Sequence, residues 1–177
     1  MAFLYNIGIQ AYHLAIQLAA PFNEKAALLH KGRKEVWKKA AGIQRGEGRL
    51  VWFHAASLGE FEQGRPVIEA LKAAEPATQI LLTFFSPSGY EIRKNYTGAD
   101  YILYLPGDTR RNAVRLIEKF RPDAAVFIKY EFWFHYLNEL NKRNIPVYLI
   151  SAIFRPNQPF FKSWGKLHRR MLGCFKE

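Results

Sequence analysis

The sequence predicts an α/β fold with a doubly wound parallel sheet, preceded by an apolar amino-terminal helix. Short apolar segments alternate along the chain with segments of helical length and pattern. Because the apolar segments are continuous rather than alternating, both faces of the sheet are expected to be covered by helices. With 177 residues, of which 49% are hydrophobic and 15% aromatic, the chain is large enough for one packed domain.

The amino-terminal stretch "MAFLYNIGIQAYHLAIQLAAPFN" has no charged side chain before Glu24. Its length suits a membrane crossing, and the basic residues after it fit an anchor whose downstream side is cytoplasmic. It lacks the basic start and the cleavage site of a secretory signal peptide. Its apolar character is reduced by four polar residues, Asn6, Gln10, His13 and Gln17. The stretch is therefore predicted to be a membrane anchor or interfacial helix, with a helix packed on the domain as the alternative.

A basic helix is expected to follow, to about Ala41. This divides the chain into a membrane-associated, basic helical segment at 1–41 and the main domain at 42–177. Buried strands are expected in the main domain at 49–56, 78–85, 99–106, 123–130 and 145–154. Helices are expected after the first four strands, at 60–76, 86–98, 108–122 and 131–144, with Asp108 as the cap of the third. A helical, basic and aromatic segment closes the chain at 157–175.

The formal net charge of +11 favours an anionic partner, which could be nucleic acid, an acidic membrane surface or a phosphorylated substrate. Cys174 is the only cysteine, so an intrachain disulfide is excluded and a cysteine-based metal site is not expected. The chain has no Walker sequence, no complete G-x-G-x-x-G and no H-E-x-x-H. A dinucleotide cofactor is therefore not indicated.

Ligands of doubly wound sheets bind beyond the carboxyl ends of the strands, so the residues that leave each strand are the candidate site. After the first strand, Ser57 and Glu60 have the spacing of a capping box, in which Ser57 caps the helix and Glu60 reaches back. That position would lower the pKa of Glu60. The alternative role for Glu60 is a general base, which needs a raised pKa. His54 is predicted to point either into the core or toward the site.

The other strand ends offer weaker signals. The hydroxyls of Ser86 and Ser88, with the permissive Gly89, could bind a phosphate or a sugar oxygen, although this sequence is also ordinary turn material. Lys129 and Glu131 would share a face of an extended segment, where they could form an ion pair or contact substrate. Arg155 leaves the fifth strand in a similar place.

Four segments in this order resemble the amino-terminal half of bacterial 3-deoxy-D-manno-octulosonic acid (Kdo) transferases. They are "HAASLGEFEQGRPVIEAL", "LTFFSPSGYE", "YLPGDTRRNAVRLIEKFRPDAAVFIKYEFWFHYL" and "PVYLISAIF". The resemblance covers nearly the whole chain. It implies one Rossmann-like half of a GT-B glycosyltransferase on the cytoplasmic face of the inner membrane. That family transfers Kdo from CMP-Kdo to a lipid A precursor with inversion, in lipopolysaccharide biosynthesis.

The resemblance also implies roles for individual residues. Glu60 matches the acid of the family's Ser-x-Gly-Glu motif and is expected to be the catalytic base that deprotonates the acceptor hydroxyl. The residues expected to bind the acceptor are His54, Ser57, Gly59, Ser86, Ser88, Gly89, Glu131 and Arg155. The family's Glu-x-Glu-x-Trp begins with Lys129 here, and its Asn-Ala-Arg-Leu-Ser corresponds to 151–155, with the basic residue displaced to Arg155.

The expected partners are the lipid A precursor and an anionic inner-membrane surface, with no nucleic acid, metal or cofactor. CMP-Kdo is expected to bind a carboxyl-terminal domain that this chain lacks, so the chain alone is expected to bind acceptor but not to transfer Kdo. The alternatives are a non-catalytic basic α/β module that binds membrane or nucleic acid, and a GT-B enzyme with another acceptor. Substitution of Glu60 discriminates the catalytic from the non-catalytic reading.

Overall fold

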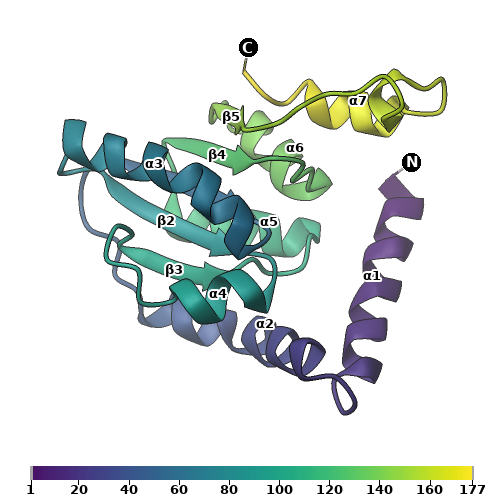
Figure 1. Cartoon of the computed structure of the whole chain (residues 1–177), viewed down its shortest axis with the longest axis horizontal. Helices are drawn as coiled ribbons and strands as arrows, with labels where there is room; N and C mark the ends of the chain where they lie inside the picture. The colour runs from purple at the N-terminus through teal and green to yellow at the C-terminus, as the bar shows by residue number, and fades with distance from the viewer. Residues whose placement is uncertain (1, 177) are drawn as a thin grey trace.

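The computed structural model describes residues 2–176 and contains one five-stranded parallel sheet (Figure 1). The strands are β1 (Leu50–Ala55), β2 (Gln79–Phe84), β3 (Tyr101–Tyr104), β4 (Ala124–Ile128) and β5 (Val147–Ile150). Their order across the sheet is β3-β2-β1-β4-β5, so β1 is the central strand. In its register, Val51 pairs with Ile80 on one side and with Ala124 on the other. The predicted parallel α/β class is confirmed.

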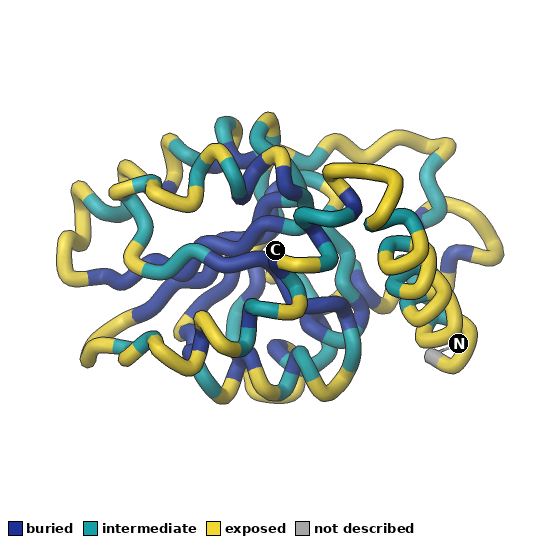
Figure 2. The backbone as a smooth tube through the Cα atoms, turned by 90° about the horizontal axis from the view of Figure 1, so that it is seen from below, coloured by how far each residue is buried: buried dark blue, intermediate teal, exposed yellow. Residues whose placement is uncertain are grey.

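Helices connect the strands and cover both faces of the sheet, as the continuous apolar strands predict. They are α1 (Ala2–Ala19), α2 (Glu24–Gly42), α3 (Leu58–Ala74), α4 (Pro87–Arg93), α5 (Arg110–Phe120), α6 (Phe134–Lys142) and α7 (Lys166–Leu172), with a 3-10 turn η1 at Pro159–Phe161. Side chains of β1 alternate between the two cores: Trp52 packs with α5 and α6, whereas Phe53 packs with α3 and α4. Figure 2 shows the strands as the buried centre of the molecule.

Helix α2 lies beside the edge strand β3 and contributes Val36 and Ala40 to the core on the α5 and α6 side. Asn23 caps its amino end by accepting a hydrogen bond from the amide of Ala26 at 3.0 Å. The predicted division between 1–41 and 42–177 falls at the end of this helix and remains a prediction. The helix itself is packed into the sheet domain.

Helix α1 packs on the domain through one face and leaves the other open. Tyr5 contacts Phe134, and Tyr12 stacks on Phe85 with ring centroids 5.9 Å apart. Its outward side chains are strongly exposed, at Phe3, Leu4, Ile7, Leu14 and Leu18. Figure 2 shows α1 as a largely exposed helix at one end of the molecule. Across residues 2–176, no helix is both long enough and apolar enough to span a bilayer.

All five strands end before their predicted ends, and β4 and β5 stop at residues with left-handed backbone. Lys129 has φ 63° and terminates β4 at Ile128; Ser151 has φ 57° and terminates β5 at Ile150. Non-glycine residues rarely adopt this conformation, and it breaks the extended chain. The expectation that Lys129 and Glu131 share one face of an extended segment is therefore wrong.

Asp108 does not cap α5 as predicted. Thr109 is the cap, and its hydroxyl accepts a hydrogen bond from the amide of Asn112 at 3.2 Å. Asp108 is buried and instead accepts from the amides of His135 and Tyr136, each at 3.1 Å, at the start of α6. Its carboxylate also accepts from the Tyr5 hydroxyl at 2.5 Å and so ties α1 to the sheet domain.

The close approach of α3 to the sheet depends on a glycine. A Cβ atom on Gly64 would lie 2.2 Å from Cδ1 of Ile128, the last residue of β4. Only a residue without a side chain lets the two elements pack at this separation. Because α3 carries Glu60 and the chain leaving β4 carries Glu131, this contact sets how the two acids face each other.

Candidate functional site

The candidate site lies where the strand order changes direction. After β1 the chain moves outward through β2 and β3, and then returns to place β4 on the other side of β1. In open α/β sheets this switch point forms a crevice beyond the carboxyl ends of the strands. His54 lies near the end of β1, Glu60 lies in the first turn of α3, and Glu131 follows β4. The structure therefore brings these three predicted residues to one place.

His54 is fully buried and joins the core to the site, which resolves its two predicted orientations into one arrangement. Its Nδ1 lies 2.9 Å from Oγ1 and 3.1 Å from the carbonyl oxygen of Thr83. Its Nε2 lies 3.0 Å from Oε2 of Glu131. His54 therefore links β2 to the carboxylate that follows β4. Glu131 also accepts from the indole Nε1 of Trp133 at 2.7 Å, so its carboxylate is held in a fixed orientation.

Glu60 is partly buried, and its Oε2 accepts a hydrogen bond from the backbone amide of Ala56 at 2.6 Å. Burial raises the pKa of Glu60, and the negative charge of Glu131 raises it further. The amide of Ala56 and the positive charges of His54 and Lys129 oppose this rise without cancelling it. The amide before the helix lowers the pKa of Glu60, as expected of a helix start, but burial and Glu131 outweigh it. A carboxylate with a raised pKa is a stronger base at neutral pH.

The predicted capping box between Ser57 and Glu60 does not form. Ser57 occupies the cap position of α3, but its side chain makes no capping hydrogen bond. Glu60 reaches back to the amide of Ala56 rather than to that of Ser57. Gly59 is exposed, and a Cβ atom there would meet no atom within 4 Å. The first turn of α3 therefore leaves open space at Gly59, next to Glu60, while Ser57 is half-buried.

Among the residues after β2, Gly89 is buried by packing, whereas the hydroxyls of Ser86 and Ser88 lie near the surface. The hydroxyls of Ser86 and Ser88 lie 2.8 Å apart and hydrogen-bond each other. The backbone amide of Ser86 donates to the carbonyl of Ala56 at 2.8 Å, which brings this turn beside the start of α3. Gly89 is buried, and a Cβ atom there would lie 2.3 Å from Cδ1 of Phe84. The absence of a side chain at Gly89 is thus explained by packing, and its contact with acceptor remains a prediction.

Arg155 lies on the exposed loop beyond β5. Its backbone amide donates to Oε1 of Gln158 at 2.8 Å, and no hydrogen bond joins its side chain to the cluster around Glu60 within residues 2–176. Lys129 and Glu131 form no ion pair in the described part of the chain, since Glu131 pairs with His54 instead. The roles of Arg155 and Lys129 toward a ligand remain predictions.

Two residues of the site escaped prediction, although signals for them exist. Trp133 is two residues after Glu131, and its indole stacks on Phe85 with ring centroids 4.8 Å apart. Thr83 pairs with His54 in the register of β1 and β2, and its hydroxyl also accepts from the indole of Trp52 at 2.8 Å. A polar threonine within the apolar residues 80–84 of β2 is the signal that a buried polar partner lies opposite.

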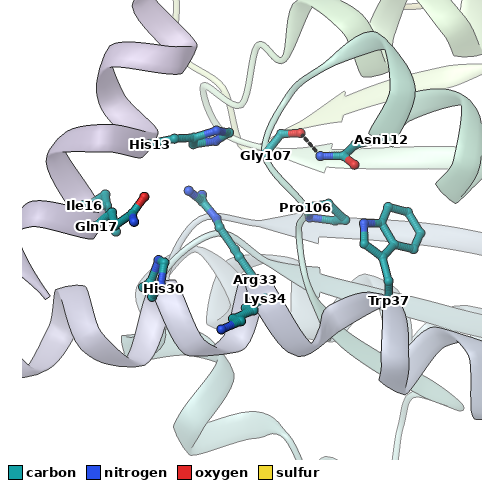
Figure 3. Close-up of a pocket in the computed structure, with 10 residues that line it drawn as sticks. All are labelled: His13, Ile16, Gln17, His30, Arg33, Lys34, Trp37, Pro106, Gly107 and Asn112. Atoms are coloured by element: carbon teal, nitrogen blue, oxygen red, sulfur yellow. Dashed lines mark hydrogen bonds between the residues drawn. The ribbon is translucent and has the colours of Figure 1, made fainter.

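A cavity of about 260 Å³ lies next to this site, between α1, α2 and the loop that precedes α5 (Figure 3). Its polar lining includes His13 and Gln17 of α1, and His30, Arg33 and Lys34 of α2. The Arg33 guanidinium packs over the ring of Phe85 at 4.5 Å from its centroid. Phe85 also stacks on Trp133, so its ring connects Arg33 of the cavity lining to the network around Glu131.

Comparison with known proteins identifies the family. Residues 23–177 match the family model described as 3-Deoxy-D-manno-octulosonic-acid transferase (kdotransferase). The chain belongs to this family. A 3-deoxy-D-manno-octulosonic acid transferase of Chlamydia trachomatis is 28% identical over 144 residues, covering 78% of this chain and 33% of the relative. One of Aquifex aeolicus is 36% identical over 84 residues, covering 47% of this chain and 23% of the relative.

This Kdo transferase family member therefore spans about a third of the length of the Chlamydia trachomatis relative. Among solved structures, a UDP-N-acetylglucosamine 2-epimerase is similar with a TM-score of 0.51 and 17% identity. The similarity covers 73% of this chain and 40% of that one. At this identity the likeness concerns the fold alone, and it agrees with the parallel sheet described above.

Proposed function

We propose that this chain is the acceptor-binding half of a Kdo transferase and that Glu60 is its catalytic base. The observation that supports this is the position of Glu60, a partly buried carboxylate with a raised pKa, at the switch point of the sheet and next to the exposed Gly59. Membership of the Kdo transferase family supports the reaction. The non-catalytic module is not favoured.

In the proposed reaction, the hydroxyl of a lipid A precursor binds within hydrogen-bond reach of Glu60 and attacks the anomeric carbon of CMP-Kdo. The donor is held by the second half of the enzyme. Glu60 takes the hydroxyl proton as the new glycosidic bond forms and the bond to CMP breaks, with inversion at the anomeric carbon. Glu131, fixed by His54 and Trp133, keeps a second negative charge near Glu60 and so maintains its basicity.

The test is Glu60→Gln in the enzyme that carries this chain together with its donor-binding half. Gln keeps the oxygen that accepts from Ala56 but cannot take a proton. Transfer from CMP-Kdo to lipid A precursor is expected to fall by roughly 10² to 10⁴-fold, the usual contribution of a general base, with acceptor binding retained. The matched control is Glu69→Gln, on the same helix and exposed. Normal turnover in E60Q would refute the assignment of Glu60 as the base. Absence of product with the unaltered enzyme would refute the proposed transfer of Kdo to lipid A precursor.

The proposal includes attachment to the cytoplasmic face of the inner membrane through the outward side of α1. Leu4 and Leu18 are 72% and 65% exposed, which is unusual for leucines in a helix that packs on a domain. Lys25 follows at the start of α2 and would favour anionic headgroups. The double variant L4S/L18S is expected to lose flotation with phosphatidylglycerol vesicles. Ile92→Ser, exposed on α4, is the control, and equal flotation of both variants refutes the attachment through α1.

A further inference from the structure

The cavity between α1, α2 and the loop before α5 has a lining that is cationic and lacks an acid. Arg33 and Lys34 contribute two basic side chains, and His13 and His30 add two imidazoles. None of the residues that line the cavity is an aspartate or a glutamate. An enclosed surface with charges of one sign concentrates ions of the opposite sign. The lining therefore favours an anion.

Arg33 is the residue that points most directly to a ligand. Its side chain rises from α2 toward His13 (Figure 3), and its Nε and Nη1 atoms are buried without a hydrogen-bond partner in the described part of the chain. Burial lowers the pKa of the Arg33 guanidinium, so the charge is held in a partly desolvated place. Buried donors are normally satisfied, and unsatisfied ones are costly. An anion in the cavity would satisfy them.

The walls of the cavity are fixed by close packing. Gly107 lies in the loop before α5, and a Cβ atom there would lie 2.0 Å from Cε1 of His13. The side chain of Asn112 donates to the carbonyl of Gly107 at 2.8 Å and holds this loop in place. The imidazole of His13 therefore rests on bare backbone at the rim. A preformed cavity of this kind loses little entropy when a ligand binds.

The size and position of the cavity restrict the chemical class of this anion further. A volume of about 260 Å³ is below that of a site for a whole drug-sized molecule and suits one charged group with part of a sugar ring. The guanidinium of Arg33 matches the oxygens of a phosphate monoester, which it can contact through two N–H groups. Phe85 packs against both Arg33 and Trp133, so a group bound by Arg33 would lie near the network that orients Glu131.

We propose that this cavity binds a phosphate monoester carried on the sugar of the acceptor, with Arg33 and Lys34 as its principal contacts. The proposal rests on the proposed function for the identity of the acceptor, and a free phosphate ion is the other source of the same chemistry. Arg33 and Lys34 would then orient the acceptor while Glu60 acts on its hydroxyl. Neither residue takes part in proton transfer.

The test is isothermal titration of the chain with N-acetylglucosamine 1-phosphate, inorganic phosphate and N-acetylglucosamine at low ionic strength. The sugar phosphate is expected to bind and the neutral sugar is not. Lys34→Gln is expected to weaken binding about tenfold, as for loss of a charged hydrogen bond. Lys31→Gln, on the same helix and outside the cavity lining, is the matched control and should change it less than twofold. Equal losses in K31Q and K34Q, or no binding of either phosphate, overturn the site.

Arg33→Gln is the stronger variant, and it is expected to abolish measurable binding. Because Arg33 also packs on Phe85, the R33Q variant could lose stability, so its unfolding transition is measured in parallel. If R33Q does not fold, the comparison of K34Q with K31Q tests the phosphate site. Tighter binding of the sugar phosphate than of inorganic phosphate supports the acceptor as the source, and equal binding overturns that part. Binding is measured without donor or turnover, so failure of the Glu60 base leaves this test unaffected.

Discussion

Gly64 and Gly59 lie on the same helix, but substitution by alanine is expected to change stability in opposite directions at the two positions. At Gly64, the new Cβ would lie 2.2 Å from Cδ1 and 2.9 Å from Cγ1 of the fully buried Ile128. Overpacking of this kind costs about 1–3 kcal/mol, and the better helix propensity of alanine returns about 1 kcal/mol. Gly64→Ala is therefore expected to lower the free energy of unfolding by about 1 kcal/mol.

In Gly59→Ala the new Cβ would have no atom within 4 Å, so only the better helix propensity of alanine acts. This variant is expected to stabilise the chain by about 0.5–1 kcal/mol. The two variants should then differ by about 2 kcal/mol, or roughly 4–8 °C in Tm. Urea and thermal unfolding measure both values. The double variant G64A/I128V removes the nearest methyl and should recover part of the loss. Equal stability of G64A and G59A would refute the argument that Gly64 sets the separation of α3 and β4.

Two further predictions concern the acids. Asp108→Ala leaves the amides of His135 and Tyr136 without their acceptor, so it should lower the free energy of unfolding by about 2–4 kcal/mol; urea titration checks this, and a loss below about 1 kcal/mol contradicts it. Because Glu60 has a raised pKa, the folded state keeps its proton to higher pH than the unfolded chain. Stability should therefore fall as pH rises above 4.5 through the folded pKa, and E60Q should flatten this slope in a pH series of unfolding curves.

The sequence predicts the five strands, their parallel arrangement and the helices between them, because apolar runs and caps are local signals. It misplaces the ends of β4 and β5, because Lys129 and Ser151 adopt a left-handed backbone that non-glycine residues rarely take. It assigns Asp108 to the wrong helix, because the amides that bind it belong to α6, far along the chain. Local spacing cannot show which helix end a buried carboxylate reaches.

The site is predicted in part for the same reason. Glu60, His54 and Glu131 all lie at or just beyond the carboxyl ends of strands that the apolar pattern identifies, so inspecting strand ends locates them. The pKa of Glu60 is not predictable from its position in the helix, because its direction depends on burial and on Glu131, which is distant in sequence. The cavity around Arg33 is not predictable either, since three separate segments enclose it.

The order of the strands also governs when the site can form. The central strand β1 pairs with β2 soon after both exist, but its other edge waits for a strand that begins at Ala124. Contacts between residues so far apart in sequence form slowly, because a long loop must close first. During synthesis, Glu60 can settle into its helix long before Glu131 and Trp133 arrive beside it. Glu60 is therefore present in the nascent chain well before the residues that raise its pKa and fix its surroundings. The complete site forms late, when β4 pairs with the central strand.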